Sequence, residues 1–191
     1  MRLLSNLQKY EIGVAGATIP NLMIHGKPAP YPVVNERAVR AGAGMLFALG
    51  FFSFFQAYYL RDFTYLQILV LLIFVDFFIK VFINPKFSPV SMVASQIVAA
   101  QKPEYVGAIQ KRFAWSIGLM LSTVMILLVY VFEITGLPNL IICGICLTFM
   151  FMESAFGICV GCKLYGLLLR FKILAEPQYR PACPGNVCAI E

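Results

Sequence analysis

The sequence has few charged residues. Asp, Glu, Lys and Arg together occupy only 13% of its 191 positions, whereas hydrophobic residues occupy 60%. Soluble domains have about a quarter charged residues and roughly half apolar ones. A water-soluble fold cannot bury this apolar excess, so the composition indicates an integral membrane protein whose first partner is the lipid bilayer.

The sequence also lacks the motifs of several common enzyme classes. It contains no glycine-rich nucleotide loop, no Ser-His-Asp set, no paired carboxylates and no His-rich metal motif, so hydrolase and kinase functions have no support. His25 is the single histidine, which leaves little basis for haem or copper sites that rely on imidazole. We therefore predict no resident cofactor and no metal.

Nucleic-acid binding is not indicated by the net charge of +6. The basic residues flank the apolar stretches instead of forming one stripe, and this is the pattern that sets the orientation of membrane helices. We predict no nucleic-acid partner.

Four stretches are long and apolar enough to cross a bilayer, which takes roughly 20 residues. They are 41–60, 64–83, 113–132 and 140–159. Lipid offers the backbone no hydrogen-bond partners, and these runs lack the period-two alternation of barrel strands. The predicted fold is an all-α, polytopic bundle of four transmembrane helices.

Lys and Arg residues gather on alternate sides of these spans. They are frequent before the first span, between the second and third, and after the fourth. Because cytoplasmic segments carry the excess of basic residues, both termini are predicted to be cytoplasmic. The residues concerned are Arg2, Lys9, Lys27, Arg37, Arg40, Lys86, Lys102, Lys111, Arg112, Lys163, Arg170, Lys172 and Arg180.

Three regions follow from these spans. Residues 1–36 form a proline-rich, extended or hairpin-like cytoplasmic cap, with Asn35 as a plausible N-cap of the first span. Residues 37–172 form the membrane domain, including a mildly apolar helix at about 88–101 that lies along the membrane surface. Residues 173–191 form a cysteine-containing tail.

All six cysteines occur in closely spaced pairs. Cys159 and Cys162 form a Cys-x-x-Cys where the last apolar segment meets Lys163, a charge that favours thiolate. This spacing allows a disulfide, a shared metal or the transfer of a sulfur atom. We predict Cys159 and Cys162 as the reactive residues. The alternative is that they are small packing residues beside a Gly157-x-x-x-Gly161 contact face.

The other two pairs have weaker support. Cys143 and Cys146 lie near the outer surface, about 24 Å of helix from the inner pair, and project to largely different sides of a straight helix. Apolar packing is the favoured role for them. Cys183 and Cys188 flank a turn-forming Pro-Gly-Asn set; a zinc or iron site shared with the inner pair is conceivable, but their spacing is at the loose end of ligand spacings.

Three charged residues fall inside the expected spans. Asp76 and Lys80 are one helical turn apart, and Glu153 lies at a similar cytoplasmic depth in the last span. Such charges are costly unless paired. We expect Asp76 and Lys80 to form an internal ion pair, with a proton or anion relay as the alternative. Glu153 is a secondary candidate that could tune a sulfur atom or pair with Lys80.

Several strings resemble a family of small bacterial four-helix membrane proteins catalogued as a domain of unknown function. The resemblance covers residues 33–170, and its most specific part is the Gly-x-Cys-x-Gly-Cys string. It implies association with rhodanese-like and thioredoxin-like proteins, and a bacterial inner membrane location. The family motifs map onto Gly157, Cys159, Gly161, Cys162, Arg112 and Phe113. The strings are Val34-Asn-Glu-Arg-Ala-Val-Arg40, Asn84-Pro-Lys-Phe-Ser-Pro89, Arg112-Phe-Ala-Trp-Ser-Ile-Gly118 and Phe156-Gly-Ile-Cys-Val-Gly-Cys-Lys-Leu-Tyr165.

The leading hypothesis is thiol-disulfide or sulfane-sulfur exchange at Cys159 and Cys162 with a thioredoxin-like or rhodanese-like soluble protein. Arg112 would hold an anionic group nearby. One alternative is a small transporter or channel component for a sulfur-containing anion, with Arg112, Lys80 and Glu153 along its path. Another is a non-catalytic subunit of a larger membrane complex.

Overall fold

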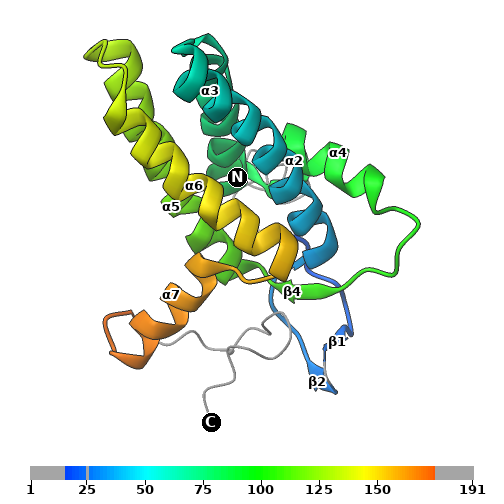
Figure 1. Ribbon diagram of the computed structural model, residues 1–191. Helices are drawn as coiled ribbons and strands as arrows, with labels where there is room; N and C mark the ends of the chain where they lie inside the picture. The colour runs from blue at the N-terminus through cyan, green and yellow to red at the C-terminus, as the bar shows by residue number, and fades with distance from the viewer. Residues whose placement is uncertain (1–15, 25, 175–191) are drawn as a thin grey trace, which may run out of the picture.

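Four long apolar helices dominate the protein (Figure 1), of which the computed structural model describes residues 16–24 and 26–174. These helical segments are 20 to 25 residues long. At about 1.5 Å per residue, each reaches roughly the thickness of a bilayer core. The predicted all-α fold with four membrane-spanning helices is confirmed. The segments are α2 (Glu36–Phe55, continued by Gln56–Leu60), α3 (Thr64–Phe78, continued by Ile79–Ile83), α5 (Ala108–Ile126, continued by Leu127–Val131) and α6 (Leu137–Phe156).

The spans form two hairpins, α2 with α3 and α5 with α6, and the main contacts run between the hairpins. α2 packs along α6, and α3 packs along α5. A cluster of buried apolar side chains joins α3, α5 and α6. Gly50 lets α2 approach this cluster closely, since a Cβ atom added there would lie 3.0 Å from Leu147 Cδ2. The cluster contains Leu66, Val70, Met125, Cys143 and Leu147.

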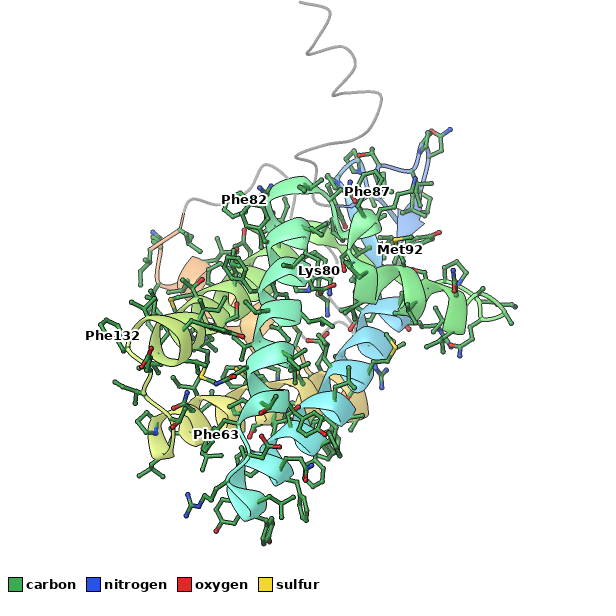
Figure 2. All side chains as sticks on the ribbon, turned by 90° about the horizontal axis from the view of Figure 1, so that it is seen from above. Phe63, Lys80, Phe82, Phe87, Met92 and Phe132 are labelled. Carbon is green, nitrogen blue, oxygen red and sulfur yellow. The ribbon has the colours of Figure 1, made fainter. Side chains whose placement is uncertain are left out.

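Large apolar side chains cover the outside of the bundle. Figure 2 shows Phe82 and Phe132 at its periphery, and Lys80 directed inward among the helices. Phe82 is 55% exposed and Phe132 62%. An apolar surface this extensive is rare on soluble monomers. We therefore assign this surface to contact with lipid.

A short antiparallel ladder ties the beginnings of α2 and α5 together. β3 (Val33–Asn35) pairs with β4 (Tyr105–Gly107), and each strand leads directly into its helix. The Asn35 side chain accepts a hydrogen bond from the Arg37 N–H at 3.2 Å, so it caps α2. The ladder therefore fixes the first turns of both helices relative to each other.

The remaining elements lie at the same end of the bundle. β1 (Met23–Ile24) and β2 (Lys27–Pro28) form a small hairpin. A 3₁₀ turn at Pro85–Phe87 follows α3 and leads into α4 (Pro89–Ile97), which packs on α2. The cysteines Cys183 and Cys188 lie outside the described residues.

The last span ends earlier than its hydropathy suggested. α6 stops at Phe156, because Gly157 adopts a left-handed conformation with φ +67°. The N–H groups of Gly157 and Ile158 donate to the carbonyls of Glu153 and Met152, a glycine-terminated helix end. A separate short helix, α7 (Val160–Arg170), then packs against α5. The two inner cysteines thus lie beyond the membrane span, at the beginning of α7.

Candidate functional site

Cys159 and Cys162 lie at the N-terminus of α7. Cys159 is the N-cap residue, and its Sγ accepts a hydrogen bond from the backbone N–H of Cys162 at 3.2 Å. Both side chains are buried, with 5% and 2% of their surfaces exposed. A helix N-terminus presents unpaired N–H groups and a partial positive charge, which stabilise a thiolate. The Cys-x-x-Cys therefore occupies the kind of position in which thiols become reactive.

Opposing effects act on the pKa of the Cys159 thiol. Its hydrogen bond with the Cys162 side chain raises the pKa, burial raises it further, and the positive charge of Lys111 lowers it. The net effect is a raised pKa, so Cys159 retains its proton at neutral pH.

Lys111 lies at the centre of a buried group of charges beside these thiols. Its ammonium group lies 2.8 Å from Glu36 Oε2 and also forms an ion pair with Glu153. The side chains of Lys111 and Glu36 are each 1% exposed. Lys111 also interacts electrostatically with Cys159 and Cys162. One cation thus faces two carboxylates and two thiols.

Three elements bring this charge cluster together. Glu36 begins α2 and Lys111 lies in the first turn of α5, and the β3/β4 ladder aligns those two turns. Glu153 lies in the last turn of α6. The Arg40 guanidinium donates to the carbonyl of Ser154 at 3.3 Å, which holds the end of α6 against α2.

Sequence reasoning identified Glu153 but not its partner. It allowed pairing with Lys80, whereas the structure pairs Glu153 with Lys111. It used Lys111 only to assign the orientation of the spans, and it named Glu36 only within a string that resembles the family. The one available signal was that Glu153, inside an apolar run, needs a cation from another helix.

Asp76 and Lys80 form a second buried ion pair, with 2.6 Å between Lys80 Nζ and Asp76 Oδ2. Asp76 Oδ1 accepts hydrogen bonds from the Ser88 hydroxyl and the Val90 N–H, both at the beginning of α4. Lys80 Nζ also lies 5.8 Å from the centre of the Trp115 ring. The pair therefore anchors α4 to α3.

The other candidates occupy different places. Arg112 follows Lys111 in α5 and is half-buried, and its carbonyl accepts a hydrogen bond from Ser116. Cys143 and Cys146 lie in α6, with Cys143 in the apolar cluster of the bundle. All four cysteines in the described part of the chain are free thiols.

A cavity of about 430 Å³ runs through the bundle, and all four spans line it. Its wall is mainly apolar. Cys143 and Cys146 line it, and so do Cys159, Lys111 and Glu153. The outer thiol pair and Cys159 of the inner pair thus face one cavity. A straight helix would separate the two pairs, but the chain turns at Gly157 and brings Cys159 back beneath the bundle.

The profile of one protein family matches residues 34–170, which include the charge cluster and the inner thiol pair. That family is described as a domain of unknown function, DUF4395. The chain belongs to the DUF4395 family. Searches among curated proteins and among solved structures found no match. The site of this DUF4395 domain therefore has to be interpreted from its own chemistry.

Within the DUF4395 region, Gly161 allows α7 to lie directly on α5. A Cβ atom added at Gly161 would lie 2.5 Å from Ala114 Cβ and 2.7 Å from Ala114 Cα. Gly161→Ala is therefore expected to push α7 away from α5, to cost about 1–3 kcal/mol of stability, and to expose Cys162. The measurement is the rate at which maleimide alkylates Cys162, followed by mass spectrometry.

Gly166→Ala is the matched control for this variant, because an added Cβ there meets no described atom within 4 Å. Its alkylation rate should equal that of the unmodified protein. Equal rates in the two variants would show that α7 is not held at Gly161.

Proposed function

We propose that this protein exchanges thiols and disulfides, or sulfane sulfur, through Cys159 and Cys162. The observation that supports this most is the placement of two thiols at a helix N-terminus, where the Cys162 backbone N–H donates to Cys159 Sγ, beside a buried lysine. An inert packing cysteine needs no cation beside it. A reacting cysteine does, because negative charge develops on its sulfur during exchange.

In this proposal one thiolate attacks the disulfide or persulfide of a soluble protein. Attack on a disulfide forms a mixed disulfide and releases the partner's other thiolate; the second cysteine then displaces the partner, and the Cys159–Cys162 disulfide forms. Attack on the outer sulfur of a persulfide instead moves that sulfur to this protein as a persulfide and releases the partner's thiolate. Lys111 stabilises the negative charge on the attacking sulfur. Its own charge is balanced by Glu36 and Glu153, so it can be buried without a bound anion.

The burial of both sulfur atoms limits how a partner reaches them. Exchange requires a local opening of the turn at Gly157 or of α7 itself. Such openings are cheapest in short segments with few tertiary contacts. α7 makes its main contacts with α5 alone, so it can move without disturbing the four spans.

We further propose that the partner is a soluble thioredoxin-like or rhodanese-like protein, and that the membrane is the bacterial inner membrane with this site on its cytoplasmic side. Arg112, next to Lys111, would attract an anionic group of the partner or substrate. Transport of a sulfur-containing anion has less support, because Lys80 and Lys111 are both paired with carboxylates and the cavity wall is mainly apolar.

The test is trapping of a mixed disulfide. The purified, reduced protein is mixed with a thioredoxin-like protein whose resolving cysteine has been replaced by Ser. The remaining cysteine of that partner first carries thionitrobenzoate in a disulfide, so that the attacking thiolate releases thionitrobenzoate. We expect a covalent complex that a reductant cleaves. The Cys159→Ser/Cys162→Ser variant should form no such complex. The yield of the complex should rise with pH. The raised pKa of Cys159 keeps its thiol protonated at neutral pH, and only the thiolate attacks a disulfide.

Cys146→Ser serves as the control and should trap as well as the unmodified protein. The single variants Cys159→Ser and Cys162→Ser then identify the attacking sulfur. Undiminished trapping by the double variant would refute the proposed function.

A further inference from the structure

Some side chains that line the cavity are also accessible from outside the protein. Ile145 and Phe149 of α6 both line the cavity and are 42% and 37% exposed. α5 and α6 also contact each other much less than α2 contacts α6. The gap between α5 and α6 is therefore the route by which we expect a molecule dissolved in the bilayer to enter.

One end of the cavity differs from the rest. Phe77 and Trp115 line it there, with Lys80 Nζ at 5.5 Å and 5.8 Å from the two ring centres. Lys111 and Cys159 line the same cavity. An apolar cavity with aromatic walls and two ammonium groups, both already neutralised by carboxylates, suits an uncharged flat ring that carries oxygen acceptors more than it suits an anion. The rest of the wall suits a hydrocarbon chain.

The redox chemistry of the neighbouring thiols further restricts which class of ligand the cavity can bind. A dithiol that becomes a disulfide releases two electrons and two protons, and these need an acceptor. An acceptor that reaches this cavity has to be soluble in lipid. Quinones with an isoprenoid chain meet both conditions, since they take up two electrons and two protons and carry the ring, oxygens and chain described above.

We propose that the cavity binds the ring of an isoprenoid quinone, which oxidises the Cys159–Cys162 dithiol. The proposal rests on the exchange function proposed above. In the reaction both S–H bonds break and an S–S bond forms. The two electrons and two protons pass to the quinone oxygens, giving a quinol. A thiolate of a soluble dithiol protein then attacks this disulfide, which is the exchange step described above in the reverse direction, so electrons pass from that protein to the quinone.

An acyl chain of a membrane lipid is the competing occupant. It would fill the apolar part of the cavity equally well. It would make no use of the ammonium groups, the aromatic end or the thiols, and it cannot accept electrons.

Quinone binding can be measured directly, because Trp115 is the single tryptophan of the chain and lines the cavity. Ubiquinone carrying one isoprene unit has a fully substituted ring, so thiols do not add to it. Titrated into the full-length protein in detergent, it should quench Trp115 fluorescence with saturation. Trp115→Phe should abolish the signal.

Two variants of α2 separate cavity binding from contact with the outer surface. Ala43 lines the cavity, whereas Ala48 lies exposed on the same helix. Ala43→Leu should weaken quinone binding about tenfold, because it fills the space that the ring needs. Ala48→Leu should leave binding unchanged. Quenching without saturation, or equal affinities of the two variants, would mean a lipid-filled cavity and overturn the proposal.

Electron transfer is measured in the same preparation. The reduced protein, without oxygen, should form one quinol for each disulfide. Cys159→Ser/Cys162→Ser should bind the quinone and form no quinol. Saturable binding without oxidation of the unmodified dithiol would overturn the redox step. If the exchange function is wrong, the trapping test yields no mixed disulfide. That result is independent of quinone binding as measured by Trp115 fluorescence.

Discussion

Replacing Lys111 with Met is expected to lower the free energy of unfolding by about 3–5 kcal/mol, the cost of removing one partner from a buried ion pair. The carboxylates of Glu36 and Glu153 would then face each other in the interior without a cation. The measurement is the unfolding of the purified protein in detergent.

The triple variant Glu36→Gln/Lys111→Met/Glu153→Gln removes all three charges and should recover most of the lost stability, since no uncompensated charge remains. Lys163→Met, at an exposed position of α7, is the matched control and should change stability by no more than about 0.5 kcal/mol. If the triple variant is as unstable as Lys111→Met alone, the cluster is not stabilised by charge balance.

Asp76→Asn is expected to destabilise the protein by about 3–5 kcal/mol for a related reason. The ammonium group of Lys80, which Asp76 neutralises at 2.6 Å, would remain buried and unpaired. The asparagine oxygen can still accept the hydrogen bonds from Ser88 and Val90 that hold the beginning of α4. The change therefore isolates the charge from the hydrogen bonds.

The double variant Asp76→Asn/Lys80→Met tests this separation. It should regain most of the stability and keep α4 protected from proteolysis. Asp76→Leu/Lys80→Met, which also removes the hydrogen-bond acceptor, should leave α4 open to cleavage. Equal protection of α4 in both double variants would show that Asp76 does not anchor it.

The four spans could be predicted from the sequence because a run of about twenty apolar residues rarely forms anything other than a membrane-spanning helix. The helix beginnings were harder. Expected spans began at residues 41, 113 and 140, whereas the helices begin at Glu36, Ala108 and Leu137. Hydropathy treats a charged residue as a boundary. Here Glu36 and Lys111 lie inside the helices, because each neutralises the other across the bundle.

The candidate site was predicted in part. The spacing of Cys159 and Cys162 pointed to a thiol pair, and the structure places both residues at the beginning of α7, where the Cys162 backbone N–H donates to Cys159 Sγ. The charges around them could not be predicted, since they come from segments far apart in the chain. The shared cavity could not be predicted either. The cavity depends on the left-handed turn at Gly157. This turn ends α6 at Phe156, whereas hydropathy extended the span to residue 159.

The β3/β4 ladder has a consequence for the order in which the protein assembles. Lys111 follows Glu36 by 75 positions, so the α2/α3 hairpin is synthesised and inserted before its cation exists. A carboxylate without a cation is costly to bury, so we expect Glu36 to stay in contact with water until β4 emerges and pairs with β3. Burial of Glu36, and with it the final packing of the beginning of α2, then follows the docking of the second hairpin.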